Sequence, residues 1–123
     1  MSAPSFSSTS YTPDRLLAGD FPRETQTVTL ISGQNLARGA VLGKITASGK
    51  YTLSLSASGD GSQTPVAILA ADTDASGGDK LAPIYLSGDF NEDRVTLGAG
   101  HTVASVRDGL RDLAIYLKKP VAA

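Results

Sequence analysis

The sequence predicts a mainly β (α+β) protein with a compact barrel or sandwich-like domain, one short helix near the C-terminus and an extended N-terminal arm. Three observations lead to this fold class. Many short runs with β-type alternation are separated by glycine-rich turns, one segment has helical spacing, and the first residues lack a sustained apolar period. At 123 residues the chain is long enough to form one domain with its own core.

The start of the chain differs in composition from the rest. It is rich in Ser, Thr and Pro, which predicts a flexible arm over residues 1–24 and a β-rich domain over residues 25–123. The arm also carries spaced apolar side chains, which favours contact with a partner surface. The candidate anchors are Tyr11, Leu16, Leu17 and Phe21. The alternative is that Leu16, Leu17 and Phe21 pack back on their own domain, because chain termini are often tied down in this way.

From Thr25 onward the apolar pattern becomes that of β-strands. In TQTVTLISG, Val28 and Leu30 share one face and threonines occupy the other. Four further runs have the composition and length of strands: GAVLGKI, KYTLSLSAS, PVAILA and LAPIYLSGDF. A last short strand is predicted in AIYLKKP, before Pro120.

One helix is predicted in HTVASVRDGLRDLAIYL. Thr102 is suitable as its N-cap, and apolar side chains share one face at helical spacing. These are Val103, Val106, Leu110 and Leu113. Gly109 weakens the helix, because glycine costs about 1 kcal/mol relative to alanine in a helix interior. The charged side chains of the segment are expected on its solvated face: Arg107, Asp108, Arg111 and Asp112.

Composition argues against several classes of function. The chain has no cysteine, which excludes disulfides and thiolate metal sites. A formal net charge of −1 lacks the basic excess of a nucleic-acid-binding protein, so no direct nucleic-acid contact is expected. No secretory signal or membrane-spanning apolar stretch is visible, which predicts a cytoplasmic product without a membrane partner. Aromatic residues make up 6% of the chain, too few to favour a stacking platform for sugars or bases.

The stretch LAADTDASGGDK has the opening of a calcium-binding loop. Asp72, Asp74, Ser76 and Gly77 follow the EF-hand order, in which oxygen ligands alternate before a glycine. The closing position, however, is Pro83, which has no side-chain oxygen. The short apolar runs on both sides are β-like rather than helical. The stretch is therefore predicted to be a surface turn between two β segments, with no metal site.

A phosphate-binding loop is not supported either. In GAVLGKI only three residues separate Gly39 from Gly43, one fewer than the P-loop requires. Lys44 is followed by Ile45, where the loop needs a hydroxyl for magnesium. Glycine and aspartate between short apolar runs instead predict turns. No cofactor is expected.

No catalytic residue is assigned, and the protein is not expected to be an enzyme. His101 is the single histidine and therefore the ordinary candidate for a general base, so a small hydrolase using His101 remains an alternative function. A Gly-x-Ser-x-Gly elbow is missing, and a loop or helix-start position is favoured for His101. The acidic pairs Asp72–Asp74 and Glu92–Asp93 are interpreted as solvated turn charges. A surface ligand-binding module is a further alternative.

The order of segments over residues 27–97 resembles the bacteriophage head decoration proteins of the lambda type. The most telling pieces are SGQNLARGAVLGK with the following SGKY, then GSQTPVAILA, and IYLSGDFN. In that family a sparsely patterned N-terminal arm precedes a compact β-rich, tulip-like domain, and a short helix comes late in the chain. The shared motifs are structural turns and strands rather than catalytic residues.

The resemblance implies a structural protein that acts on a phage head. Such proteins form homotrimers that bind the outside of the expanded capsid at three-fold positions and stabilise it against the pressure of packaged DNA. The implied partners are the major capsid protein and further copies of this chain. The implied location is the outer surface of the virion, after assembly in the host cytoplasm. The predicted helix adds support for a trimer, because it has more apolar side chains than one narrow contact with the domain needs. These are Val103, Val106 and Leu110.

Overall fold

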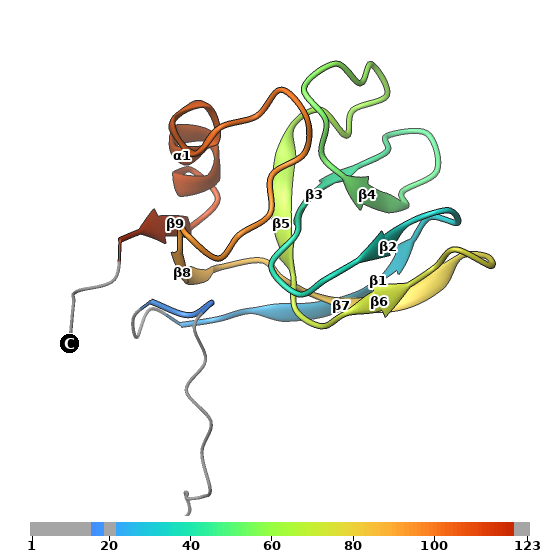
Figure 1. The fold of residues 1–123 in the computed structure, drawn as a ribbon, viewed down its shortest axis with the longest axis horizontal. Helices are drawn as coiled ribbons and strands as arrows, with labels where there is room; N and C mark the ends of the chain where they lie inside the picture. The colour runs from blue at the N-terminus through green and yellow to red at the C-terminus, as the bar shows by residue number, and fades with distance from the viewer. Residues whose placement is uncertain (1–15, 19–21, 120–123) are drawn as a thin grey trace, which may run out of the picture.

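The structure is a computed structural model that describes residues 16–18 and 22–119 (Figure 1). Within these residues the chain forms nine strands and one helix, and five of the strands close a barrel in the order β1-β4-β3-β5-β7. Their bounds are β1 Thr25–Leu30, β3 Val41–Lys44, β4 Tyr51–Leu53, β5 Pro65–Leu69 and β7 Lys80–Tyr85. Outside the barrel lie β2 Asn35–Leu36, β6 Thr73–Asp74, β8 Gly88–Asn91, α1 Val103–Arg111 and β9 Ile115–Lys118. The predicted class, a mainly β barrel with one short helix, is confirmed.

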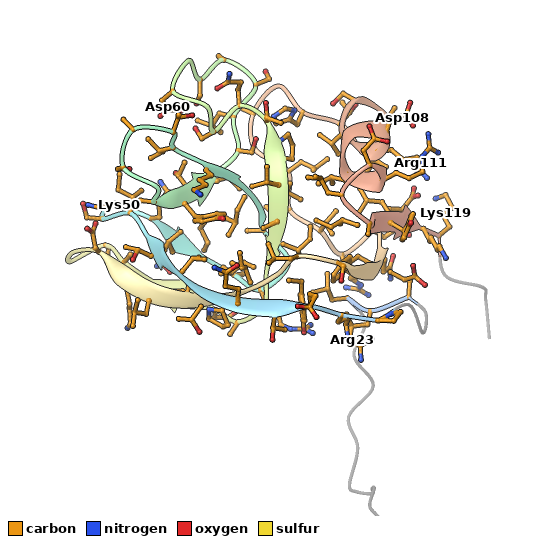
Figure 2. All side chains as sticks on the ribbon, turned by 180° about the vertical axis from the view of Figure 1, so that it is seen from behind. Arg23, Lys50, Asp60, Asp108, Arg111 and Lys119 are labelled. Atoms are coloured by element: carbon orange, nitrogen blue, oxygen red, sulfur yellow. The ribbon has the colours of Figure 1, made fainter. Side chains whose placement is uncertain are left out.

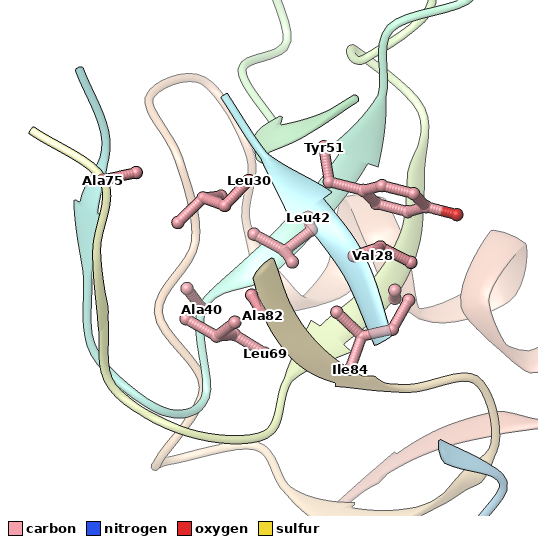
Figure 3. Packing of buried hydrophobic residues seen from close by; sticks show 10 residues of the cluster. Val28, Leu30, Ala40, Leu42, Tyr51, Leu69, Ala75, Ala82 and Ile84 are labelled. Atoms are coloured by element: carbon pink, nitrogen blue, oxygen red, sulfur yellow. The ribbon is translucent and has the colours of Figure 1, made fainter. Parts of the chain in front are cut away.

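The barrel interior is filled by alternate residues of its strands. Val28 and Leu30 point inward from β1, and Val28 lies opposite Ala82 of the antiparallel strand β7. Figure 3 shows these side chains meeting Leu42 and Ile84 inside the barrel. The period of two seen in TQTVTLISG is therefore the inside-outside alternation of this barrel.

A second core lies between the barrel wall, the helix and the β8–β9 pair. Strands β3 and β5 contribute to both cores, because neighbouring residues on a strand face opposite sides. Leu42 and Leu69 point into the barrel, whereas Val41 and Ile68 point into the second core. Burial on both faces explains why these strands are nearly continuous apolar runs in the sequence. The buried residues of the second core are Leu16, Val41, Ile68, Phe90, Val106, Leu110, Ile115 and Leu117.

Two predicted strands differ from the structure in length. LAPIYLSGDF forms two strands, β7 and β8, because the chain leaves the barrel between them and Gly88 has a φ of 141°, which favours glycine. The run KYTLSLSAS is a strand only over β4, and beyond it the Ser56 N–H donates to the Ala99 carbonyl. The chain thus turns from the barrel toward the loop that precedes the helix. The last strand, predicted in AIYLKKP, is confirmed as β9.

The helix begins as the sequence predicts. Thr102 is its N-cap: the Ser105 N–H donates to the Thr102 hydroxyl over 3.1 Å, and the Thr102 N–H donates to the Ser105 hydroxyl over 2.9 Å. Val106 and Leu110 are buried in the second core, while Leu113 lies beyond the helix end and is exposed. The apolar side chains of the helix, which suggested a trimer contact, thus pack largely within the domain. They no longer support a trimer.

Gly109→Ala is expected to raise the free energy of unfolding by about 0.5–1 kcal/mol, because alanine restricts the unfolded chain and is the better helix former. A Cβ atom at Gly109 would have no atom within 4 Å outside the helix backbone. Urea unfolding measures the change. In the matched control, Gly98→Ala, the new Cβ would overlap the Ser54 carbonyl oxygen, so this variant should lose stability. A Gly109→Ala protein less stable than the wild type would contradict the expectation.

Candidate functional site

The structure describes two of the four predicted arm anchors, Leu16 and Leu17. Tyr11 and Phe21 lie outside the described residues. Leu16 is buried in the second core, and Leu17 forms an antiparallel bridge with Phe90 of β8. The backbone adds two hydrogen bonds: the Asn91 N–H donates to the Leu16 carbonyl over 2.6 Å, and the Ala18 N–H donates to the Asp89 carbonyl over 3.1 Å. For Leu16 and Leu17 the alternative of packing on their own domain therefore holds, and capsid contact by the anchors stays a prediction.

We call residues 16–18 the arm root. The chain is fastened again just before the barrel, where the Ser87 hydroxyl donates to the Pro22 carbonyl over 2.9 Å and the Glu24 N–H donates to that hydroxyl over 3.0 Å. The Leu86 N–H in turn donates to the Glu24 carbonyl over 2.8 Å. Contacts of the domain thus begin within the predicted arm, ahead of β1.

The arm root and the last strand meet at one end of the molecule. The root pairs with β8 through Leu17 and Phe90, and β9 pairs with β8 in parallel, with Leu117 opposite Phe90. Figure 1 shows the blue root segment, β8 and the dark red β9 on the same side of the barrel. The point where residues 1–15 join the domain and the point where the chain leaves β9 are therefore close together. We call this part of the molecule the β8–β9 end.

Charges at the β8–β9 end are paired across segments far apart in sequence. Glu92 was expected to be a solvated turn charge, but its carboxylate is largely buried and accepts from the Arg107 guanidinium at 2.7 Å. Arg107 also donates to the Leu117 carbonyl over 3.0 Å, so it joins α1 to β9 rather than lying on a purely solvated face. The Lys118 ammonium lies 3.3 Å from the buried Asp89 carboxylate. Local sequence patterns did not reveal these pairs, because each pair joins segments that come together only in the folded domain.

His101 links two loops of the domain. Its Nε2 lies 3.1 Å from the Ser54 hydroxyl and 3.1 Å from the Gln63 carbonyl. Because a carbonyl only accepts, a hydrogen bond to Gln63 requires the tautomer with its proton on Nε2, and in that tautomer Nε2 has no lone pair with which to take the proton of Ser54. Ser54 is also fully buried, which denies a substrate access to its hydroxyl. This geometry does not favour the hydrolase alternative.

The carboxylates of LAADTDASGGDK accept hydrogen bonds from backbone N–H groups of neighbouring turns. Asp72 accepts from the Arg38 N–H over 2.8 Å, and Asp79 accepts from the Ser32 N–H over 2.8 Å and pairs with Lys50. Asp74 accepts from both the hydroxyl and the N–H of Ser76, and these hydrogen bonds hold the pKa of the Asp74 carboxyl below its ordinary value. The stretch connects β5 to β7 as predicted, and it contains the short strand β6, which the sequence did not indicate. The absence of a metal requirement stays a prediction.

The compact β-rich domain followed by a late helix has the order of elements that the sequence resemblance implied, that of the head decoration proteins of bacteriophages. The model of the family described as Bacteriophage lambda head decoration protein D matches residues 6–116, and the chain belongs to this family. The family is a structural capsid decoration family and not an enzyme family, so its members are components of the phage head.

A search of curated proteins gave no match. No helix in the described part of the chain is long and apolar enough to cross a membrane.

Proposed function

We propose that this protein binds the outside of the expanded phage head as a homotrimer at three-fold positions and stabilises the shell against the pressure of packaged DNA. Membership of the head decoration family supports the role on the capsid. The observation that carries the mode of attachment is the arm root, which fixes the origin of residues 1–15 at the β8–β9 end. The β8–β9 end is proposed to face the shell, and the arm, with Tyr11 as an anchor, is proposed to reach the major capsid protein.

The arm alone does not supply enough side-chain burial to hold one copy strongly. Ordering each arm residue costs roughly 1–2 kcal/mol of backbone entropy, while full burial of a large apolar side chain contributes about 1.5–3 kcal/mol. Because Leu16 is already buried in the domain, the contribution to capsid binding must come from other residues of the arm. Two further contributions would offset the remaining entropy cost. The arm can form main-chain hydrogen bonds to a strand of the capsid protein, and one oligomer carries several arms that bind together. This balance favours a trimer over a monomer as the binding unit.

The test is co-sedimentation of the protein with expanded capsids assembled without it. Saturable binding at a fixed ratio of three copies per three-fold position is the expected result, together with heads that withstand higher temperature at full genome load. Protein that binds unexpanded and expanded shells equally poorly would remove the proposal. Sedimentation equilibrium across the same concentrations, with and without shells, separates a trimer in solution from one that forms only on the lattice.

A further inference from the structure

We propose that a groove between α1 and β9 receives a side-chain carboxylate of the capsid protein when the domain is seated on the shell. This inference rests on the proposed function. The groove has a volume of about 190 Å³ and is lined by Arg107, Arg111, Tyr116, Leu117 and Lys118. Small-molecule sites typically measure roughly 300–1,000 Å³, so the groove suits one side chain better than a separate ligand. None of these five lining side chains is acidic.

Three of the five side chains that line the groove are cationic, and each of them pairs with a carboxylate of the domain. Two of these carboxylates are buried, since only 7% of the Asp89 side chain and 12% of the Glu92 side chain are exposed. Their cationic partners, Arg107 and Lys118, are 38% and 53% exposed. At these two ion pairs an approaching partner therefore meets the positive group first. A carboxylate is the complementary charge.

The two arginines have different roles. Arg107 is held in place, because one guanidinium nitrogen donates to the Leu117 carbonyl and another to Glu92. Arg111 instead pairs within its own helix, at 2.8 Å from Asp108 one turn away, and the two side chains are 58% and 81% exposed. Such exposed pairs contribute little to stability, so exchanging Asp108 for a partner carboxylate is easy. A guanidinium can also bind a carboxylate through two parallel hydrogen bonds.

The position of the groove points to the capsid as the source of the carboxylate. Its floor is formed by β9, and Leu117 lies opposite Phe90, which on its other side pairs with Leu17 of the arm root. The arm that is proposed to hold the shell thus leaves the domain beside the groove. Figure 2 shows Arg111, Asp108 and Lys119 on this side of the molecule, with Lys50 and Asp60 at the opposite end.

The first experiment compares full-length variants for binding to expanded shells made without the protein. Arg111→Ala should weaken binding about ten-fold, the effect of losing one partly desolvated ion pair, and Arg111→Glu should weaken it further. Asp108→Ala removes the same internal ion pair but leaves Arg111 available, so its binding should equal or exceed that of the wild type. Lys50→Ala breaks an exposed pair at the far end and should bind as the wild type does. Melting temperatures confirm that each variant is folded.

The second experiment identifies the partner group. Shells whose surface carboxylates have been converted to amides should bind the wild type and Arg111→Ala equally, so that the ten-fold ratio falls to about one. Equal binding of the wild type, Arg111→Ala and Arg111→Glu to untreated shells would overturn the inference while leaving the proposed function intact. A ratio that persists on amidated shells, or an Arg111→Glu protein that changes its oligomeric state in solution, would also overturn it, the latter in favour of a contact between copies. Failure of the wild type to bind any shell would instead refute the proposed function.

Discussion

Phe90→Ala is expected to lower the free energy of unfolding by about 3–5 kcal/mol, the usual cost of removing a buried phenylalanine ring. Phe90 is fully buried in the second core, and its ring centroid lies 5.3 Å from that of Tyr85. Its backbone is the shared pairing partner of the arm root and β9. The cavity would therefore open beneath the segments that form the β8–β9 end. Chemical denaturation followed by circular dichroism measures the loss.

The control for Phe90→Ala is Leu81→Ala, because Leu81 lies on the outer face of β7 and is 69% exposed. This variant should change the free energy of unfolding by less than about 0.5 kcal/mol. Phe90→Leu should fall between the two, since it retains much of the apolar volume. A loss below about 1 kcal/mol for Phe90→Ala would show that the second core does not depend on this ring.

Deletion of residues 1–15 is expected to reduce binding to expanded capsids by about a hundred-fold or more, because each copy loses its arm and the avidity of several arms is lost together. The domain should keep its stability to within about 0.5 kcal/mol, because the cut lies before the arm root. Binding is measured by co-sedimentation and stability by denaturant unfolding. A truncated protein that binds as tightly as the full chain would show that the arm is not the capsid anchor.

A longer deletion, of residues 1–24, serves as the control for position. It removes Leu16 from the second core together with the hydrogen bonds of residues 16–18 and 22–24. We expect it to lower the free energy of unfolding by about 2–5 kcal/mol, as large-to-small changes in a core do. The arm predicted from the sequence ends at Glu24, so this cut falls at the predicted domain boundary. Because Leu16 is buried in the second core, a deletion that tests the arm alone must end before the arm root.

Elements defined by local patterns could be predicted from the sequence. The alternation around Val28 and Leu30 identifies a half-buried strand wherever it occurs, and Thr102 followed by helical spacing identifies the start of α1. The family could also be predicted, because its motifs are turns and strands in a fixed order. Each of these signals lies within a short window of residues.

The β8–β9 end could not be predicted, because it depends on pairing between distant segments. The apolar character of Leu16 fits either a capsid anchor or a core residue, and only its bridge to β8 distinguishes the two. Glu92 and Arg107 are each ordinary surface residues by their local sequence, yet the fold brings the residue after β8 and the helix α1 together, and the two side chains pair at 2.7 Å. The start of the domain could not be predicted for the same reason. The composition changes at Glu24, but hydrogen bonds between the chain start and β8 begin at Leu16.

The shared strand β8 also bears on the order in which the protein matures. The arm root is made near the beginning of synthesis, but its partner β8 is made late, and β9 comes almost at the end. Contacts of such long sequence separation form slowly and after the local ones. A nascent or prematurely terminated chain therefore cannot complete the β8–β9 end, even when its barrel strands are already present. If the arm binds the shell as proposed, only a finished chain offers it from a fixed point, and incomplete molecules would then compete poorly for places on the shell.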